Sequence, residues 1–305
     1  MLDLGKMDTE KRNERTMHID EMSTSEIVAL INSEDHRCAE AVKAALPEIA
    51  QAVDIIYGKL HNGGRLIYCG AGTSGRLGIL DASECPPTYG VDSSMVMGLI
   101  AGGPGAIINA VEGAEDDAAL GVNDLRSIEF GAGDVLVGIA ASGRTPYVIG
   151  AMDYAHEIGA PVIAVVCCSG SEMSKHADVT IAAVPGPEVV TGSSRMKSGT
   201  CQKMVLNMLS TSTMIKLGKV YGNLMVDVRA TNEKLRKRAL SIVRSATGAD
   251  EGEAQAALDA CGHSCKTAIV MILAGITADE AAKALKEADG RVAGVLAAKS
   301  KRSLR

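Results

Sequence analysis

Two turns of the chain combine glycines with hydroxyl side chains, a composition that suits phosphate binding. The first is Gly-Ala-Gly-Thr-Ser-Gly at residues 70–75, which follows the apolar run 66–69 and precedes a helical segment. The second, at residues 141–146, follows the apolar run 135–140 in the same way. Backbone amides at a helix start, assisted by hydroxyls, hold an anion well. The candidate phosphate-binding residues in these turns are Gly72, Thr73, Ser74, Ser142, Gly143, Arg144 and Thr145.

The first turn also matches the dinucleotide-binding pattern G-x-G-x-x-G, in which glycines let the backbone approach a phosphate closely. That pattern needs an acidic residue at the end of the next strand to hold the ribose. Asp92 lies before the next β-rich run, 95–100, and that run ends at Ile100-Ala-Gly-Gly. A nicotinamide or flavin site is therefore disfavoured. A bare structural turn stays open for the first segment, and a Ser/Thr helix cap stays open for the second.

A third segment, residues 190–200, is dense in hydroxyls, carries two cations and precedes a long apolar-periodic stretch that reaches Lys216. Cationic side chains at the start of a helix oppose its dipole unless an anion sits there. We therefore expect this segment to contact an anionic ligand. Its candidate residues are Ser193, Ser194, Arg195 and Lys197.

Two glutamates are candidates for acid–base chemistry. Glu84 lies before Cys-Pro-Pro-Thr, at the end of the helix that starts at the first turn. Glu115 follows the glycine-rich loop 102–105. Two carboxylates in different environments can act as acid and base in one site. Taken alone, each glutamate also fits an ordinary solvated surface position.

The elements that must position these residues alternate short β-rich runs with helix-length segments. This pattern predicts an α/β fold with a doubly wound parallel sheet covered by helices on both faces. A capping box at Ser23 and Glu26 predicts helices near the N-terminus, and another at Thr277 and Glu280 belongs to short Ala-rich helices at the C-terminus. The expected organisation is an N-terminal helical segment (1–50), a doubly wound α/β domain (51–225) and a C-terminal three-helix unit (231–305).

Composition excludes several classes of partner. A net charge of −6 provides no general field for polyanions, and an aromatic content of 2% without Trp removes the stacking platforms of single-strand nucleic-acid binders. No apolar run approaches the roughly 18 residues of a membrane span. Eight scattered cysteines and the lack of a basic, apolar leader suit a reducing cytosol. The cluster Cys261-Gly-His263-Ser-Cys265 lacks a fourth ligand, so we expect structural cysteines rather than a metal site.

Four long motifs carry a resemblance to a known family. Residues 65–88, 110–117, 142–146 and 191–200 closely resemble the bacterial N-acetylmuramic acid 6-phosphate etherases, and the likeness runs from Arg15 to about Leu296. That family belongs to the sugar isomerase (SIS) domains, which bind phosphosugars on a flavodoxin-like sheet. The C-terminal segment resembles a ubiquitin-associated-type three-helix module.

The resemblance implies cleavage of the D-lactyl ether of N-acetylmuramic acid 6-phosphate in cell-wall amino sugar recycling. Lactate would leave by elimination across C2 and C3 of the open-chain sugar, and water would then add. By motif match, Glu84 resembles the family's proton donor and Glu115 its second catalytic carboxylate. The resemblance implies no metal or organic cofactor, a phosphate held by the Ser-Gly-x-Thr turn, and a homodimer whose sites are completed by the partner. The alternatives are a non-catalytic phosphosugar sensor of the glucokinase regulatory type and an aldose–ketose isomerase.

Overall fold

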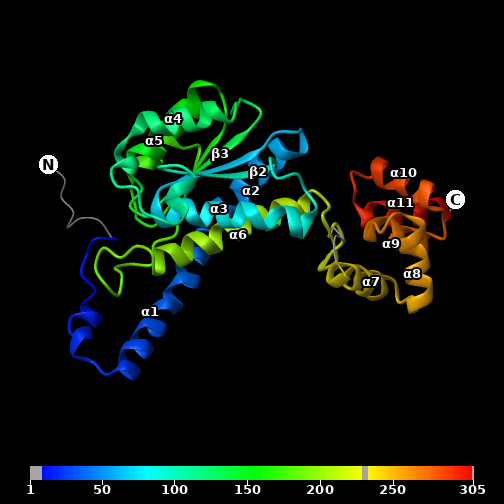
Figure 1. The fold of residues 1–305 in the computed structure, drawn as a ribbon, viewed down its shortest axis with the longest axis horizontal. Helices are drawn as coiled ribbons and strands as arrows, with labels where there is room; N and C mark the ends of the chain where they lie inside the picture. Colours follow the sequence, from blue (N-terminus) through cyan, green and yellow to red (C-terminus); the bar gives the residue numbers. More distant parts are fainter. Residues whose placement is uncertain (1–8, 229–232, 304–305) are drawn as a thin grey trace. The chain divides into compact units, whose positions relative to one another are not determined.

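The computed structural model describes residues 9–228 and 233–303 and is built around one parallel β-sheet (Figure 1). The strands are β1 (Leu66–Gly70), β2 (Val96–Ile100), β3 (Val135–Ala140), β4 (Val162–Val166) and β5 (Val179–Ala182). They pair in the order β2-β1-β3-β4-β5. Strands β1, β3 and β4 are buried along their whole length, as expected for strands covered on both faces. This order confirms the doubly wound, flavodoxin-like sheet predicted from the sequence.

Helices cover both faces of the sheet. They are α1 (Thr24–Ala44), α2 (Leu46–His61), α3 (Gly72–Tyr89), α4 (Ala118–Ser127), α5 (Pro146–Glu157) and α6 (Lys197–Lys216). On β1, Ile67 and Cys69 pack into the core formed with α5, whereas Tyr68 lies against Gly78 of α3. Figure 1 accordingly shows α4 and α5 above the sheet and α3 and α6 below it. The capping box at Ser23 is present at the start of α1, as predicted.

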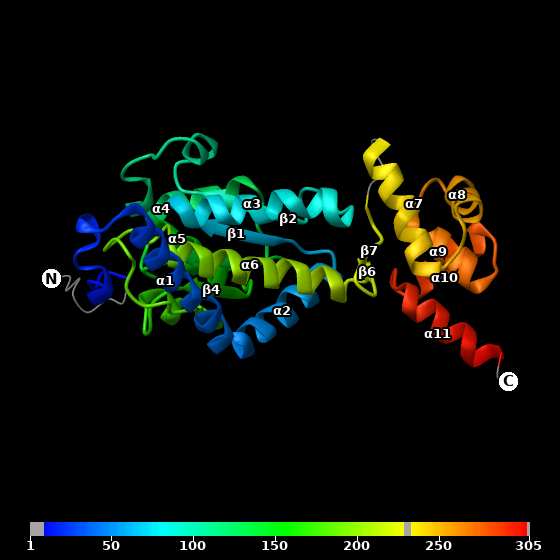
Figure 2. The same ribbon diagram turned by 90° about the horizontal axis from the view of Figure 1, so that it is seen from below.

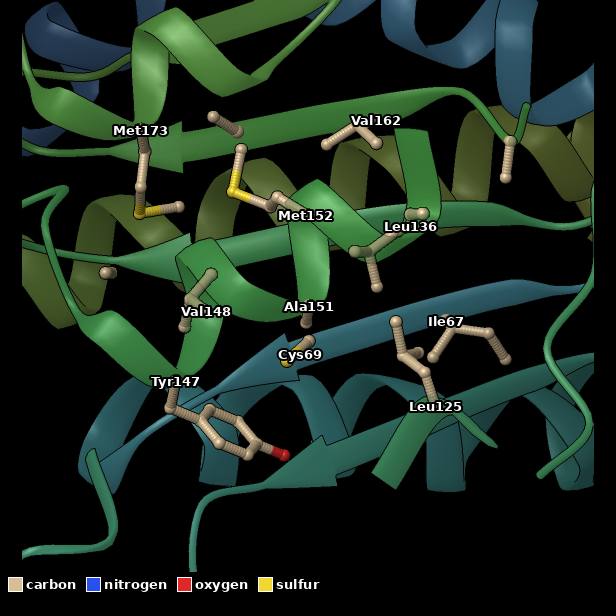
Figure 3. Packing of buried hydrophobic residues seen from close by; sticks show 14 of the residues in the cluster. Ile67, Cys69, Leu125, Leu136, Tyr147, Val148, Ala151, Met152, Val162 and Met173 are labelled. Carbon is tan, nitrogen blue, oxygen red and sulfur yellow. The ribbon is translucent and has the colours of Figure 1, made fainter. Parts of the chain in front are cut away.

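One hydrophobic core lies between the sheet and helices α4 and α5 (Figure 3), where Leu136 is fully buried. Two glycines let these helices touch. A Cβ at Gly121 would lie 2.1 Å from the carbonyl oxygen of Tyr147, and one at Gly150 would lie 2.2 Å from that of Ala118. Larger residues at either position would push α5 away from α4, and with it the turn that begins α5.

Helices α3 and α6 lie side by side and are joined by buried polar groups (Figure 2). Asp81 of α3 accepts hydrogen bonds from Asn207 (2.8 Å) and Ser210 (3.1 Å) of α6. Ser74, at the start of α3, donates to Gln202 of α6 (2.9 Å). Burial raises the pKa of Asp81 above its usual value, although these bonds favour its charged form.

The chain divides into two compact units. One holds residues up to Ser83 together with Ser93–Ser210, and the other holds Glu84–Asp92 together with the residues from Thr211 onward. Apart from the ends of α3 and α6, the elements of the second unit are β6 (Val220–Tyr221), β7 (Leu224–Met225), α7 (Glu233–Thr247), α8 (Glu251–Ala260), α9 (Cys265–Ala274), α10 (Ala278–Glu287) and α11 (Val292–Ser303).

The second unit has its own core, centred on α9, which contacts α7, α8, α10 and α11. Ile269 and Val270 of α9 are fully buried. The predicted short helices are present, with the capping box of Thr277 and Glu280 at the start of α10. Among the described residues, no single helix has the length and apolar character to cross a membrane. Helices α8 and α9 meet those criteria only as a pair bent by 118°.

Candidate active site

The carboxyl ends of β1 and β3 border a cleft of about 580 Å³. Strand β1 pairs with β2 on one side and β3 on the other, so successive connections leave toward opposite edges of the sheet. Open parallel sheets bind ligands at this switch point. The residues that line the cleft are Thr9, Glu10, Ala71, Gly72, Thr73, Ser74, Glu115, Asp116, Ile139, Ala140, Ala141, Ser142, Arg144, Thr145, Pro146 and Ser194.

The first turn brings the start of α3 to the cleft. Gly72 has a φ of +52°, a conformation that favours glycine. Thr73 lines the cleft with its hydroxyl side chain. Ser74 also lines it, but its side chain is buried and its hydroxyl is committed to Gln202. The turn therefore offers the Thr73 hydroxyl and the backbone amides at the helix start.

The second turn places Ser142, Arg144 and Thr145 in the cleft, directly before α5. Gly143 is buried and does not line the cleft, but it shapes the turn. Its φ is +63°, and an added Cβ would lie 2.4 Å from the Cβ of Ser171. The two turns together thus bring two helix starts, several hydroxyls and one guanidinium to a single cavity, which is an arrangement suited to a phosphate ester.

The third segment contributes less than the sequence predicted. Ser194 lines the cleft, whereas Ser193 and Arg195 are not among its lining residues, and Arg195 is exposed. The assignment of Lys197 to ligand binding is wrong. This side chain is fully buried, and its ammonium lies 2.5 Å from a carboxylate oxygen of Glu34.

An internal anion occupies the start of α6. The carboxylate of Glu188 is fully buried and accepts hydrogen bonds from the backbone amides of Lys197 and Ser198, each at 2.9 Å. Sequence reasoning was right that a cation at this helix start needs an anion. The anions are Glu188 and Glu34 of the chain itself, so this helix end is not available to a substrate.

Glu34 also anchors the N-terminal segment that reaches the cleft. Its carboxylate accepts from Asn13 (2.9 Å) and Arg15 (2.5 Å) as well as from Lys197. Burial opposes ionisation, but Lys197 and Asn13 hold the pKa of Glu34 below its usual value. Thr16 donates to the carbonyl oxygen of Val189 (2.8 Å). These bonds fix the chain just after the two cleft-lining residues nearest the N-terminus.

The two candidate catalytic glutamates are placed differently. Glu115 lies in a 3-10 helix, η5 (Ala114–Asp116), is exposed and lines the cleft. Glu84 is also exposed, but it lies on α3 ten residues beyond Ser74, a helical rise of about 15 Å. It is not among the residues that line the cleft.

Sequence reasoning missed Thr9, Glu10 and Asp116 as cleft residues. Thr9 is buried, and its hydroxyl has no hydrogen-bond partner among the described residues. Nothing in the composition around Thr9 and Glu10 signals a ligand, because no turn glycine or strand end adjoins them. Their position follows from anchors in distant parts of the chain, chiefly Glu34.

Comparisons with known proteins identify the family. Residues 48–156 match the glucokinase regulatory protein N-terminal SIS domain, and residues 129–212 match the SIS domain. A solved structure that resembles part of this chain is a phosphoheptose isomerase from Neisseria gonorrhoeae, with a TM-score of 0.47 and 22% identity over 61% of this chain and 99% of that chain.

Curated relatives match nearly the whole sequence. The N-acetylmuramic acid 6-phosphate etherase of Serratia proteamaculans is 59% identical over 289 residues, which cover 95% of this chain and 97% of that protein. The etherase of Klebsiella aerogenes is 57% identical over 291 residues, with the same coverage. Identity at this level along both full lengths shows that the chain belongs to the N-acetylmuramic acid 6-phosphate etherase family.

Proposed function

We propose that this protein is a carbon–oxygen lyase that cleaves the D-lactyl ether of N-acetylmuramic acid 6-phosphate, giving N-acetylglucosamine 6-phosphate and D-lactate. The observation that carries the proposal is the 59% identity to an etherase of that name over 95% of the chain. The cleft at the carboxyl ends of β1 and β3 supports it, because it unites two turns suited to phosphate with a carboxylate.

The phosphate is proposed to sit between the two turns. Thr73, Ser142 and Thr145 supply hydroxyls, Arg144 supplies a guanidinium, and the starts of α3 and α5 supply backbone amides. Charge-assisted hydrogen bonds of this kind contribute about 1.5–3 kcal/mol each. A phosphate fixed in this way keeps the rest of the sugar in the same cleft as Glu115.

The chemistry proposed is elimination followed by hydration. In the open-chain sugar, the hydrogen on C2 is acidic because C1 is an aldehyde, so the carboxylate of Glu115 suffices as base. The departing lactate alkoxide is a poor leaving group and needs a proton, which we assign to Glu84. Water then adds at C3 of the unsaturated intermediate. We propose no metal or organic cofactor, since proton transfers alone complete this sequence.

The position of Glu84 supports a homodimer. Within one chain it lies about 15 Å along α3 from the phosphate turn, on an exposed stretch of helix. Leu80, one turn earlier on the same face, is an apolar side chain that is 49% exposed. We propose that this face of α3 packs against a second copy, and that Glu84 of the partner subunit supplies the proton. All eight cysteines are free, which suits a reducing cytosol.

Subunit mixing tests this arrangement. Glu84→Gln and Glu115→Gln are each expected to lower turnover at least about 10²-fold, the usual scale for losing a general acid or base. If the two residues in one site come from different subunits, a random mixture of the two variants regains about a quarter of wild-type activity, because half the dimers are mixed and each has one intact site. No recovery after verified subunit exchange would place both residues in one chain.

Isotopes test the reaction itself. Elimination and hydration predict deuterium at C2 of product formed in deuterated water. They also predict that the C3 hydroxyl takes its oxygen from ¹⁸O-labelled water, while lactate keeps the ether oxygen. Label in lactate with an unexchanged C2 would contradict the mechanism. Failure to release D-lactate at all would favour the non-catalytic sensor, and conversion to a ketose phosphate would favour the isomerase.

A further inference from the structure

A second, smaller cavity of about 190 Å³ adjoins the cleft. The two cavities share Ala71, Gly72 and Glu115. Because Glu115 lines both, its carboxylate marks the junction between them. A substrate that extends from one cavity into the other would therefore pass this carboxylate.

The walls of this side cavity combine one cation with small apolar residues. They comprise Arg76, Glu112, Ala101, Ala106, Ala110 and Val111. One water occupies about 30 Å³ in the liquid, so the volume admits a group of several heavy atoms. The lining suits a small anion that also carries a methyl group.

Arg76 is held in place and retains donors for a ligand. Its Nε donates to the carbonyl oxygen of Ile107 (2.8 Å) and one Nη donates to that of Ala106 (2.7 Å). A guanidinium has five N–H donors, so three remain. In the described ranges, no carboxylate lies within ion-pair distance of Arg76. A guanidinium oriented in this way matches a carboxylate in a bidentate geometry.

We propose that the side cavity binds the lactyl group, with Arg76 holding its carboxylate and Val111 and the alanines facing its methyl. This inference rests on the proposed function, since only the muramic substrate carries a lactyl ether. With the phosphate in the cleft and the lactyl group in the side cavity, the C2–C3 region of the sugar lies between them, at Glu115. The enzyme thus recognises the leaving group separately from the phosphosugar.

Charge explains why Arg76 is needed. Glu112 and Glu115 also line the side cavity, so an added carboxylate meets two like charges. Within the described lining of this cavity, Arg76 is the cation available to offset them. Its removal is expected to affect an ionised lactyl group far more than a neutral one.

The test uses three probes reduced at C1, a change that removes the aldehyde and prevents turnover. They are N-acetylmuramic acid 6-phosphate, the same compound with a lactyl carboxamide, and N-acetylglucosamine 6-phosphate. In the wild type the acid is expected to bind at least about 10-fold more tightly than the amide, as one charge-assisted contact allows. In Arg76→Gln this ratio falls to about one or below, and the dissociation constant of the glucosamine probe changes less than about twofold.

Arg144→Gln is the matched control. It removes the guanidinium of the phosphate cleft and should weaken the binding of all three probes alike. The ratio of the dissociation constants of the acid and the amide should therefore be preserved. Equal weakening of all three probes by Arg76→Gln would overturn the proposal, because Arg76 would then act only through the loop at residues 106–107. A wild type that binds acid and amide equally would overturn it too.

A second variant keeps the proposal testable if Arg76→Gln does not fold. Val111 is 47% exposed, so Val111→Phe fills the side cavity without disturbing the core. It should weaken both lactyl probes and spare the glucosamine probe, and unchanged binding of the lactyl probes would contradict the assignment. Release of D-lactate from the true substrate by the wild type tests the proposed function separately. Lactate release without discrimination between acid and amide would reject the side cavity alone.

Discussion

The buried pair between Glu34 and Lys197 allows a quantitative test of the reassignment of Lys197. Both side chains are fully buried, and Nζ of Lys197 has a second contact only to the carbonyl oxygen of Pro185 (3.3 Å) among its described hydrogen bonds. Glu34→Gln leaves the ammonium of Lys197 buried without a counter-charge, which lowers the free energy of unfolding by about 3–5 kcal/mol. For a unit of roughly 200 residues this lowers Tm by roughly 6–20 °C.

The double variant Glu34→Gln/Lys197→Met isolates the charge pair. It removes both charges, so we expect it to be more stable than either single variant by about 2 kcal/mol or more, a coupling typical of residues in contact. Arg15→Ala is the matched control, because Arg15 binds the same carboxylate but its side chain is 45% exposed. Its loss should cost at most about 1 kcal/mol.

Near-ultraviolet circular dichroism of tyrosine is a suitable readout, since the chain has no Trp and both Tyr68 and Tyr147 are fully buried in the sheet unit. Because the pKa of Glu34 is lowered in the folded protein, its stabilising contribution is present above the unfolded pKa. That contribution is lost as pH falls through the folded pKa, and the double variant should lack this component. A Lys197→Met variant with wild-type stability but no affinity for phosphosugar would refute the reasoning and return Lys197 to the ligand site.

Three further outcomes are expected. Ser142→Ala combined with Thr145→Val should weaken binding of N-acetylglucosamine 6-phosphate by about 1.5–3 kcal/mol per lost bond, and an unchanged dissociation constant in calorimetry would place the phosphate elsewhere. Burial raises the pKa of Asp81, so the native state loses stability as pH rises from about 4 to that raised value. Asp81→Asn should flatten this part of a plot of Tm against pH, and an unaltered slope would exclude Asp81 as its source. Activity should survive exhaustive chelation, because proton transfer needs no metal and the thiol of Cys265 donates to a backbone carbonyl. Inactivation that is reversed by a divalent cation would make the cluster at Cys261 and Cys265 a candidate metal site again.

The sheet was predictable because its three central strands, β1, β3 and β4, are fully covered. Runs such as 162–168 are continuously apolar, and the helical segments between them have the length of crossover connections. The two phosphate turns were predictable for a related reason, since each follows a strand directly and the carboxyl ends of parallel strands meet at one edge. At these positions the apolar pattern of the sequence and the topology of the parallel sheet predict the same structure.

Contacts between distant segments were not predictable in this way. The partner of Lys197 is Glu34, which lies 163 residues earlier, and a lysine beside a helix start gives no sign of which anion it meets. Likewise, Arg76 follows the first turn as an ordinary helix residue. Its relevance depends on the loop near Ile107, whose path no periodicity reveals. The separation of Glu84 from the cleft depends on the length and course of α3, which the motif alone did not convey.

The anchoring of the N-terminal segment has a consequence for biosynthesis. Thr16 is held by Val189, which is made 173 residues later. At translation rates of about 5–20 residues per second, this bond must wait roughly 9–35 s after Thr16 is added to the chain. The anchoring of the segment that carries Thr9 and Glu10 is therefore completed only near the end of synthesis of the sheet unit. A ribosome-bound chain that stops before Val189 has both phosphate turns but an unfinished wall.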